Sequence, residues 1–502
     1  FGKQDLVSAL HRYLKPLLML TGTYPAVAMN PPYMGSRQMN ADLKSYMKKH
    51  YPMSKRDLFA VFMEVGEQNT QPGGRLGMIN QHSWMFLSSY EDLRTHVLDT
   101  TLIESMLHLG PNTFDEISGE VVQSTAFVLK NELPQGQTGT YFRLVDENSS
   151  TAKKKAFEAG DHRHSSVDQR DFETIPGAPV VYWLSNQALS HFDSLETIGE
   201  KLKLCEGMTT ADNNRFLRVW SEVSKDDLGL DFGNEKDALE SGKKWFPYEK
   251  GGRLRKWYGN QKFVVYWHND GYIIRNFDRS YVRNDDYYFR EGLTWSNISS
   301  GSIGVRYSPP GRLFASKGPK AFGDKNIWYC LPLLNSKVAA LYLNAVSPTL
   351  DFKLGHLGAV PISKGRIESE ATEKGKDCYE RAKADWDSRE TSWDFTQHPL
   401  IQQNAASLEA AYDAWKAQAT DDFLQLHANE EELNELFIDL YGLQDELSPH
   451  VELGDITILD DELDWDAIDA LEEERDTLSH DALHTRLLED DPEQAPFKME
   501  VP

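Results

Sequence analysis

The chain has 502 residues, 40% of them hydrophobic and 26% charged, which is the balance of an ordinary globular protein of about three domains. No apolar run reaches the roughly 18–20 residues of a membrane helix and no cleavable signal pattern opens the sequence, so we expect neither a membrane nor a secreted protein. The three cysteines (Cys205, Cys330 and Cys378) lie far apart. They form no disulfide framework or zinc cluster in sequence, so we expect no metal site and a cytoplasmic location.

The net charge of −25 is unevenly distributed. Residues 366–502 hold 10 basic and 38 acidic side chains, whereas residues 1–365 hold 43 basic and 40 acidic ones. Between Ser241 and Cys330 the basic side chains outnumber the acidic ones by 16 to 7. The overall acidity therefore does not exclude a nucleic-acid partner for the middle of the chain.

The first third of the sequence alternates helical and strand patterns. Helices are predicted over residues 4–20, 57–69 and 90–99. Buried strands are predicted over 25–29, 76–80, 101–109 and 121–131, with a turn at 71–74. This alternation predicts an α/β fold with a mostly parallel sheet, in which ligands bind beyond the carboxyl ends of the strands.

The rest of the chain changes composition several times. Residues 134–175 are polar and are predicted to be a linker or a loosely held insertion. A second, aromatic-rich domain of short strands and turns is predicted up to residue 362, followed by helices near 367–388, 401–418 and 429–442. After Pro449 the sequence is sharply acidic, and we expect much of residues 455–502 to be poorly ordered.

The stretch from Asn30 to Tyr33 reads Asn-Pro-Pro-Tyr and follows the first predicted strand. Two prolines continue neither a strand nor a helix, so the chain turns sharply there. The turn presents the Asn30 amide, the Pro31 carbonyl and the Tyr33 ring, a set that suits a flat ring carrying an amino group. The alternative is a plain loop after a strand.

This tetrad resembles the Asn-Pro-Pro-Tyr motif of DNA N6-adenine methyltransferases. The similarity continues through Asp57-Leu-Phe59, Gly73-Gly-Arg-Leu-Gly-Met-Ile79, Gly207-Met-Thr-Thr-Ala-Asp-Asn213, Trp295-Ser296 and Leu334-Asn-Ser-Lys-Val338. Over residues 1 to about 445 the series is similar to the PglX-type methyltransferases of BREX phage-defence systems.

The resemblance implies a part of a Rossmann-like methyltransferase sheet, followed by a mixed α/β target-recognition domain and a helical C-terminal segment. It implies S-adenosyl-L-methionine as cofactor, double-stranded DNA as substrate and other phage-defence proteins as partners. Asn30 and Pro31 would accept hydrogen bonds from the adenine amine, Pro32 would keep the turn rigid, and Tyr33 would stack on the extruded base. Asn30 and Asp57 would flank the cofactor, although Asp57 equally suits the start of a helix.

One feature departs from the family. The glycine-rich turn that holds the cofactor should precede Asn30, yet the 29 residues before it contain no such turn. We therefore expect a methyltransferase domain that lacks its upstream cofactor motif and is inactive as an isolated chain.

Candidate DNA contacts lie in the second domain. Between Trp245 and Trp295, 15 of 51 residues are aromatic and many Lys and Arg are interspersed. We expect most of these aromatic residues to fill a core, and the loop with Arg253, Arg255 and Lys256 to contact phosphates. Asn213 and Arg215 form a second candidate contact loop, with a purely structural role as the alternative.

The predicted division of the chain is a catalytic part (1–135), a linker (136–175), a DNA-recognition domain (176–362), a helical segment (363–450) and an acidic tail (451–502). The predicted function is site-specific adenine-N6 methylation of DNA in phage defence. The alternatives are a non-catalytic DNA-recognition component and a part of a fused restriction-methylation enzyme. The acidic tail is predicted to be solvated, or else to compete with DNA for the basic face.

Overall fold

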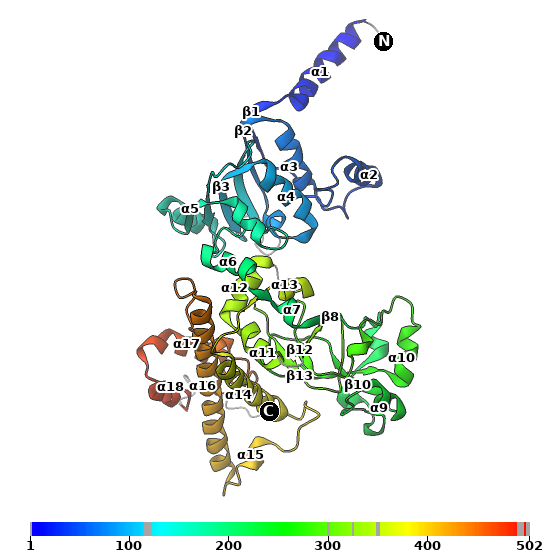
Figure 1. Cartoon of the computed structure of the whole chain (residues 1–502), viewed down its shortest axis with the longest axis vertical. Helices are drawn as coiled ribbons and strands as arrows, with labels where there is room; N and C mark the ends of the chain where they lie inside the picture. Colours follow the sequence, from blue (N-terminus) through cyan, green and yellow to red (C-terminus); the bar gives the residue numbers. More distant parts are fainter. Residues whose placement is uncertain are drawn as a thin grey trace. The chain divides into compact units, whose positions relative to one another are not determined.

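The computed structural model describes residues 3–114, 122–298, 302–323, 326–347, 352–488 and 496–497. The chain divides into two compact units, Phe1–Asp193 and Ser194–Pro502, which are described separately (Figure 1). In the described part of the chain, every helix is too short or too polar to cross a membrane.

The first unit is built on a six-stranded sheet in the order β1-β2-β4-β3-β5-β6. Its strands are β1 (Tyr24–Met29), β2 (Thr70–Gln81), β3 (Leu102–Gly110), β4 (Ser124–Lys130), β5 (Gly139–Arg143) and β6 (Arg163–Val167). The β1–β2 and β3–β5 pairs are parallel, and the other pairs are antiparallel. The mixed α/β fold is confirmed, but the sheet contains more antiparallel pairs than predicted, because β4 pairs antiparallel with both of its neighbours, β2 and β3.

Helices of the first unit are α1 (Lys3–Thr21), α2 (Ala41–His50), α3 (Leu58–Gln68), α4 (Glu91–Thr100), α5 (Ser150–Ala159) and α6 (Asn186–Ser194). Helix α3 packs closely on β2, because a Cβ on Gly66 would lie 2.7 Å from Leu76 Cδ1. The predicted turn at 71–74 is instead an irregular start of β2, where Gly73 has a φ of +74°.

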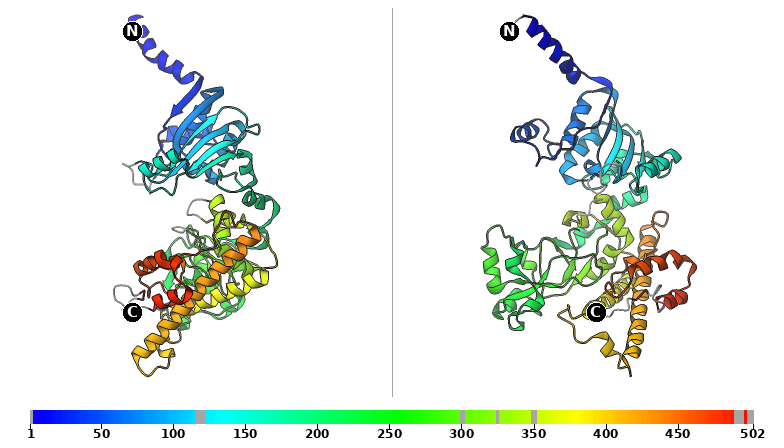
Figure 2. Two further views of the ribbon diagram at one scale, coloured as in Figure 1. Left: turned by 90° about the vertical axis from the view of Figure 1, so that its left-hand side faces the viewer. Right: turned by 180° about the vertical axis from the view of Figure 1, so that it is seen from behind.

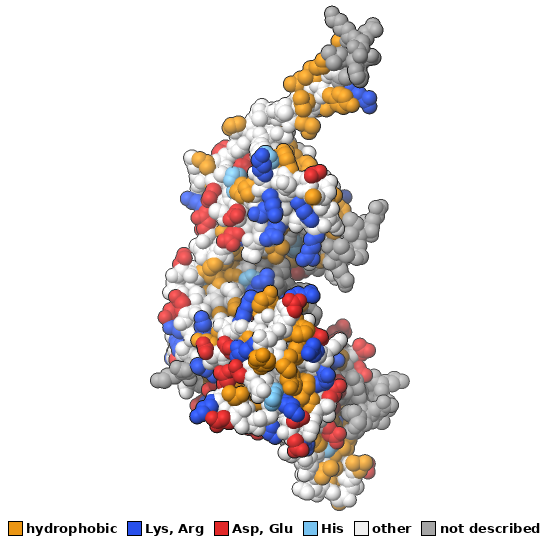
Figure 3. All heavy atoms as spheres, turned by 90° about the vertical axis from the view of Figure 1, so that its right-hand side faces the viewer, with side chains coloured by type: hydrophobic (Ala, Val, Ile, Leu, Met, Phe, Trp, Pro, Cys, Tyr) orange, Lys and Arg blue, Asp and Glu red, His pale blue; other side chains and the backbone are white. Residues whose placement is uncertain are grey.

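Helix α1 confirms the predicted helix 4–20 but leaves its apolar side chains in solvent. Its residues Leu17, Leu18 and Leu20 are 59%, 62% and 72% exposed. Figure 3 shows hydrophobic side chains on this helix near the top of the view.

The predicted linker at 136–175 is wrong, because this segment holds β5, α5 and β6 and completes the sheet. Tyr141 and Phe172 are fully buried and their rings lie edge to face with centroids 6.1 Å apart. The polar composition reflects one solvent-facing side of these elements, whereas the few large apolar residues face the core.

The second unit holds two four-stranded sheets and one two-stranded sheet, in the orders β14-β10-β11-β9, β13-β12-β15-β8 and β16-β7. The strands are β7 (Glu196–Thr197), β8 (Lys203–Cys205), β9 (Leu217–Val219), β10 (Trp245–Glu249), β11 (Phe263–Tyr266), β12 (Gly292–Thr294), β13 (Arg306–Ser308), β14 (Leu313–Phe314), β15 (Lys320–Phe322) and β16 (Pro361–Ile362). Aromatic side chains such as Trp257, Tyr258 and Trp295 are fully buried, which confirms that the aromatic residues mostly form a core.

Short helices surround these sheets and long ones close the unit. The helices are α7 (Ile198–Lys201), α8 (Asn213–Phe216), α9 (Glu235–Glu240), α10 (His268–Arg275), α11 (Ile327–Asn335), α12 (Lys337–Val346), α13 (Leu354–Gly358), α14 (Glu368–Asp387), α15 (Pro399–Gln402), α16 (Leu408–Tyr441), α17 (Trp465–Glu474) and α18 (His480–Leu487). The helices predicted at 401–418 and 429–442 are mostly one continuous helix, α16, because no Gly or Pro interrupts residues 408–441.

The prediction of a poorly ordered acidic end is wrong for the described residues 455–488. Ile456, Ile458, Leu463 and Ile468 of this stretch are buried. Figure 2 shows its helices α17 and α18 lying beside α16. Acidic side chains outnumber basic ones here, yet every third or fourth residue is apolar, which is enough to build a packed face.

Candidate active site

The corner formed by Asn30, Pro31, Pro32 and Tyr33 lies at the carboxyl end of β1, the edge strand of the first sheet. Asn30 and Pro32 are exposed, Pro31 is buried and Tyr33 is half-buried. The buried proline anchors the turn while the Asn30 amide faces solvent. The corner is therefore accessible to a ligand and is not packed inside the core.

The Tyr33 ring packs against other aromatic residues. Its ring lies edge-on to Phe59, with centroids 6.1 Å apart and an interplanar angle of 83°, and Phe59 in turn contacts Tyr90. The Tyr33 hydroxyl is buried and lies close to the Ser124 side chain. Burial raises the pKa of this phenol above its ordinary value, so the group is neutral at physiological pH.

Asp57 connects the corner to α3. Its Oδ1 caps the helix by accepting a hydrogen bond from Phe59 N at 3.3 Å, and it also accepts one from Met34 N at 3.0 Å. Leu58 N donates to Met34 O at 3.1 Å, which is a second hydrogen bond between Met34 and the start of α3. Burial raises the pKa of Asp57, while the backbone hydrogen bonds oppose that rise.

Asp57 thus takes the helix-start role, one of the two roles that the sequence left open. It is 8% exposed and its oxygen is engaged with the residue directly after Tyr33. These contacts make it a residue that positions the corner. The expected place of Asp57 beside the cofactor stays a prediction.

The end of β2, next to the corner, contains polar groups that sequence reasoning did not single out. Met29 and Met78 form the last β1–β2 pair, and Asn80 lies two residues further along β2, which continues past the end of β1. Asn80 is fully buried, and neither its amide oxygen nor its nitrogen has a partner among the described residues. The strand register was the signal that could have found it.

Residues Gln81 to Trp84 lie at the end of β2 and in a single turn of 3-10 helix, His82–Met85. His82 Nδ1 lies 2.8 Å from His108 Nε2, and His108 Nδ1 lies 3.1 Å from the Tyr182 hydroxyl. Burial lowers the pKa of His82 to about 4, so this relay of rings is uncharged near neutral pH.

The residues of the corner fit an amino group. Asn30 and Pro31 offer two acceptor oxygens at a strand end, which match the two N–H donors of such a group. Residues 3–29, which include α1 and β1, contain a single glycine, Gly22.

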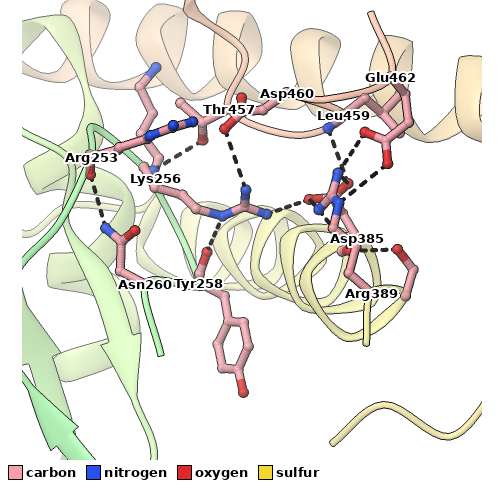
Figure 4. A network of polar contacts seen from close by, with 12 residues as sticks. Arg253, Lys256, Tyr258, Asn260, Asp385, Arg389, Thr457, Leu459, Asp460 and Glu462 are labelled. Carbon is pink, nitrogen blue, oxygen red and sulfur yellow. Dashed lines mark hydrogen bonds and ion pairs between the residues drawn. The ribbon is translucent and has the colours of Figure 1, made fainter. Parts of the chain in front are cut away.

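The predicted DNA contacts Arg255 and Lys256 are buried instead, and Figure 4 shows Lys256 next to Thr457. Arg255 is 4% exposed, forms an ion pair with Asp385 and donates from Nε to Tyr258 O at 2.9 Å. Lys256 is 9% exposed and its Nζ lies 2.5 Å from Glu430 Oε2. In this structure the two side chains are structural cations, because carboxylates of the helical part already neutralise them.

The other three predicted DNA contacts remain accessible. Asn213, Arg215 and Arg253 are exposed. Arg215 lies at the end of α8, where its guanidinium carbon sits 5.2 Å from the Phe277 ring centroid. Asn213 and Arg215 follow Asp212, which caps α8 by accepting from Arg215 N at 3.0 Å.

Comparisons with known proteins agree with the motif series. A family model, the Eco57I restriction-modification methylase, matches residues 8–114. The adenine-specific methyltransferase PglX of Lacticaseibacillus casei (strain Zhang) is 43% identical over 459 residues, which are 88% of this chain and 38% of that protein. The adenine-specific methyltransferase BrxX of Escherichia coli O9:H4 (strain HS) is 36% identical over 90% of this chain and 37% of that protein.

The chain thus spans about two fifths of the length of these curated relatives. Among solved structures, the type IIL restriction-modification enzyme MmeI in complex with DNA covers 84% of this chain and 55% of that chain, at 10% identity and a TM-score of 0.48.

Proposed function

We propose, from the premise that the chain is PglX-like, that it is part of a site-specific DNA adenine-N6 methyltransferase and that its corner at Asn30–Tyr33 binds the target adenine. The observation that carries this proposal is the exposed Asn30 amide next to the buried Pro31 at the end of an edge strand. The matched relatives are named adenine-specific methyltransferases.

Adenine N6 is a weak nucleophile because its lone pair is delocalised into the ring. The Asn30 side-chain oxygen and the Pro31 carbonyl would each accept one N–H of the amine, which favours a pyramidal nitrogen and stabilises the positive charge that develops on it. Tyr33 would stack on the base after its rotation out of the duplex. S-adenosyl-L-methionine would supply the methyl group when bound.

Other residues would keep this arrangement rigid. Asp57 fixes the residue after Tyr33 through the Met34 amide, and Phe59 supports the Tyr33 ring. A fixed geometry lowers the barrier because the reacting groups no longer search for their orientation. Double-stranded DNA is the proposed substrate, contacted through Asn213, Arg215 and Arg253, and phage defence with other defence proteins is the proposed role.

The test is Asn30→Ala in the full-length protein. We expect adenine methylation to fall at least about 100-fold, because an acceptor to the transition state is lost, with duplex affinity nearly unchanged. Asn30→Asp retains acceptor oxygens at the same position and should keep measurable activity. Mass spectrometry of digested DNA reads the methylation, and methylation retained at the parent rate by Asn30→Ala would contradict the mechanism.

A second candidate is a non-catalytic DNA-recognition component. It rests on the exposed Asn213, Arg215 and Arg253 of the second unit, which offer duplex contacts that do not involve the corner. A full-length protein that binds duplex DNA yet transfers no methyl group from S-adenosyl-L-methionine would support this candidate.

A further inference from the structure

Four segments of the second unit that are far apart in sequence meet in one loop cluster, which we define as residues 207–215, 250–253, 296–298 and 315–318. Backbone hydrogen bonds join the first and last segments, from Met208 N to Phe314 O and from Ser316 N to Met208 O, both 3.0 Å. Gly252 N donates to Ser296 Oγ at 3.0 Å, and Asn297 Nδ2 donates to Ser316 O at 2.8 Å. The cluster is therefore one connected surface.

Glycines make this close approach of backbones possible. A Cβ on Gly207 would lie 1.8 Å from Phe314 O, and one on Gly318 would lie 2.6 Å from Gly251 N. No other residue type fits at either position without moving the backbone. The loops are consequently held in a fixed relation, which a surface that binds a rigid partner requires.

The cluster presents cations that the rest of the unit does not neutralise. Arg215, Arg253 and Lys317 are exposed, and none of them forms an ion pair with another described residue. Elsewhere in the unit Arg275 is paired with Asp270 and Asp285, and Arg283 with Glu206. Arg290 and Arg366 are exposed outside the cluster. Arg255 and Arg306 are buried.

The charge of the remaining surface points the same way. Residues 366–502 carry 38 acidic and 10 basic side chains, so that part of the unit repels a polyanion. The loop cluster, by contrast, exposes the amides of Asn213 and Asn214 and the three cations. The Asp212 carboxylate is committed to capping α8.

We propose that the loop cluster is a phosphate-contact surface, on which Arg215, Arg253 and Lys317 bind the backbone of duplex DNA and fix its register. This inference rests on the proposed function, because it presupposes that the chain binds a duplex. Phosphate contacts position a duplex without reading its sequence, whereas base edges are read by other side chains. The cluster thus keeps Arg215 and Arg253 of the predicted contacts and adds Lys317, whereas Arg255 and Lys256 are buried.

The test measures duplex affinity of the 502-residue chain as a function of salt concentration. Each single variant, Arg215→Ala, Arg253→Ala or Lys317→Ala, should lower affinity about tenfold near 0.1 M salt and reduce the slope of log K against log salt by about one. The losses should be equal on duplexes of unrelated sequence. Lys236→Ala removes a lysine that is 80% exposed on α9 and serves as the matched control, with no expected loss.

Arg253→Lys keeps a point charge and should keep the salt slope. Thermal unfolding of each variant verifies that the surface substitutions leave the fold intact. A triple variant combines Arg215→Ala, Arg253→Ala and Lys317→Ala. If the parent chain binds duplex DNA with a steep salt dependence and this triple variant keeps the same slope, the inference is wrong while the proposed DNA binding stands. Losses confined to one DNA sequence would equally reject a phosphate role, and a parent chain without duplex binding at low salt would reject both proposals.

Discussion

At the residue scale, the corner depends on one carboxylate. Asp57 Oδ1 accepts from the amides of Met34 and Phe59, so a single side chain both starts α3 and fixes the residue after Tyr33. This arrangement buries the carboxyl group. Burial disfavours the charged form of Asp57 and therefore raises its pKa. Asp57 thus links the segment at Met34 to the start of α3 and influences the site by fixing the position of the corner.

Asp57→Ala should therefore have two effects. Loss of the cap should reduce the free energy of unfolding by about 1–2 kcal/mol, and loss of the Met34 link should lower methylation by the full-length protein more than the stability loss explains. Asp57→Asn keeps an acceptor oxygen and should lose less in both measurements. Urea unfolding and methylation rates at a temperature where both variants are folded provide the comparison, and an Asp57→Ala variant with parental activity would refute the positioning role.

At the element scale, patterns along the chain were sufficient for individual helices and strands but not for their partners. The strand before Asn30 and the helix after Asp57 follow from apolar spacing and from a capping residue, and both are confirmed. Arg255 and Lys256 were interpreted as exposed because no local signal shows that Asp385 and Glu430, more than a hundred residues later, neutralise them. Likewise, nothing local to Asn80 indicates that its side chain is fully buried near the end of β2.

The contact between the loop at 255–257 and α16 can be tested directly. Glu430 is 5% exposed and its two oxygens accept from Lys256 Nζ at 2.5 Å and from Trp257 Nε1 at 2.7 Å. Glu430→Ala leaves the Lys256 ammonium buried without a partner and should lower the free energy of unfolding by about 3–5 kcal/mol.

Two further variants make this measurement specific. Glu432, two residues along the same helix, is paired with Lys374 and its side chain is 50% exposed, so Glu432→Ala should change stability by less than about 1 kcal/mol. Combining Lys256→Met with Glu430→Met removes both charges and should recover much of the loss. If denaturant titrations gave equal losses for the Glu430 and Glu432 substitutions, the buried pair would contribute no more to the free energy of unfolding than the exposed pair.

At the scale of the whole molecule, the C-terminal segment (residues 451–488) acts as part of the second unit's core. Lys256 N donates to Thr457 Oγ1 at 3.1 Å and Leu459 N donates to Asp385 Oδ1 at 3.0 Å, so one short stretch contacts both the loop at 255–257 and α14 (Figure 4). Glu462 accepts from Arg389 Nη2 at 2.6 Å. Although burial opposes ionisation, Arg255 and Arg389 hold the pKa of Asp385 below its ordinary value, so the network is charged at neutral pH.

The acidity of this segment and its packing therefore predict different results for its removal. If the segment screened cations from DNA, deleting residues 451–502 would raise duplex affinity. Instead, we expect the deletion to lower the melting temperature of the second unit by several degrees or more. The buried side chains of Ile456, Ile458, Leu463 and Ile468 would be lost from the core, and Arg255 and Arg389 would lose carboxylate partners. The double variant Glu473→Gln and Glu474→Gln is the matched control, since both side chains are exposed and their neutralisation removes charge without removing packing. It should melt like the parent, whereas the deletion should also bind a dye for exposed apolar surface. A deletion variant that melts like the parent and binds duplex DNA more tightly would establish the screening role in place of the structural one.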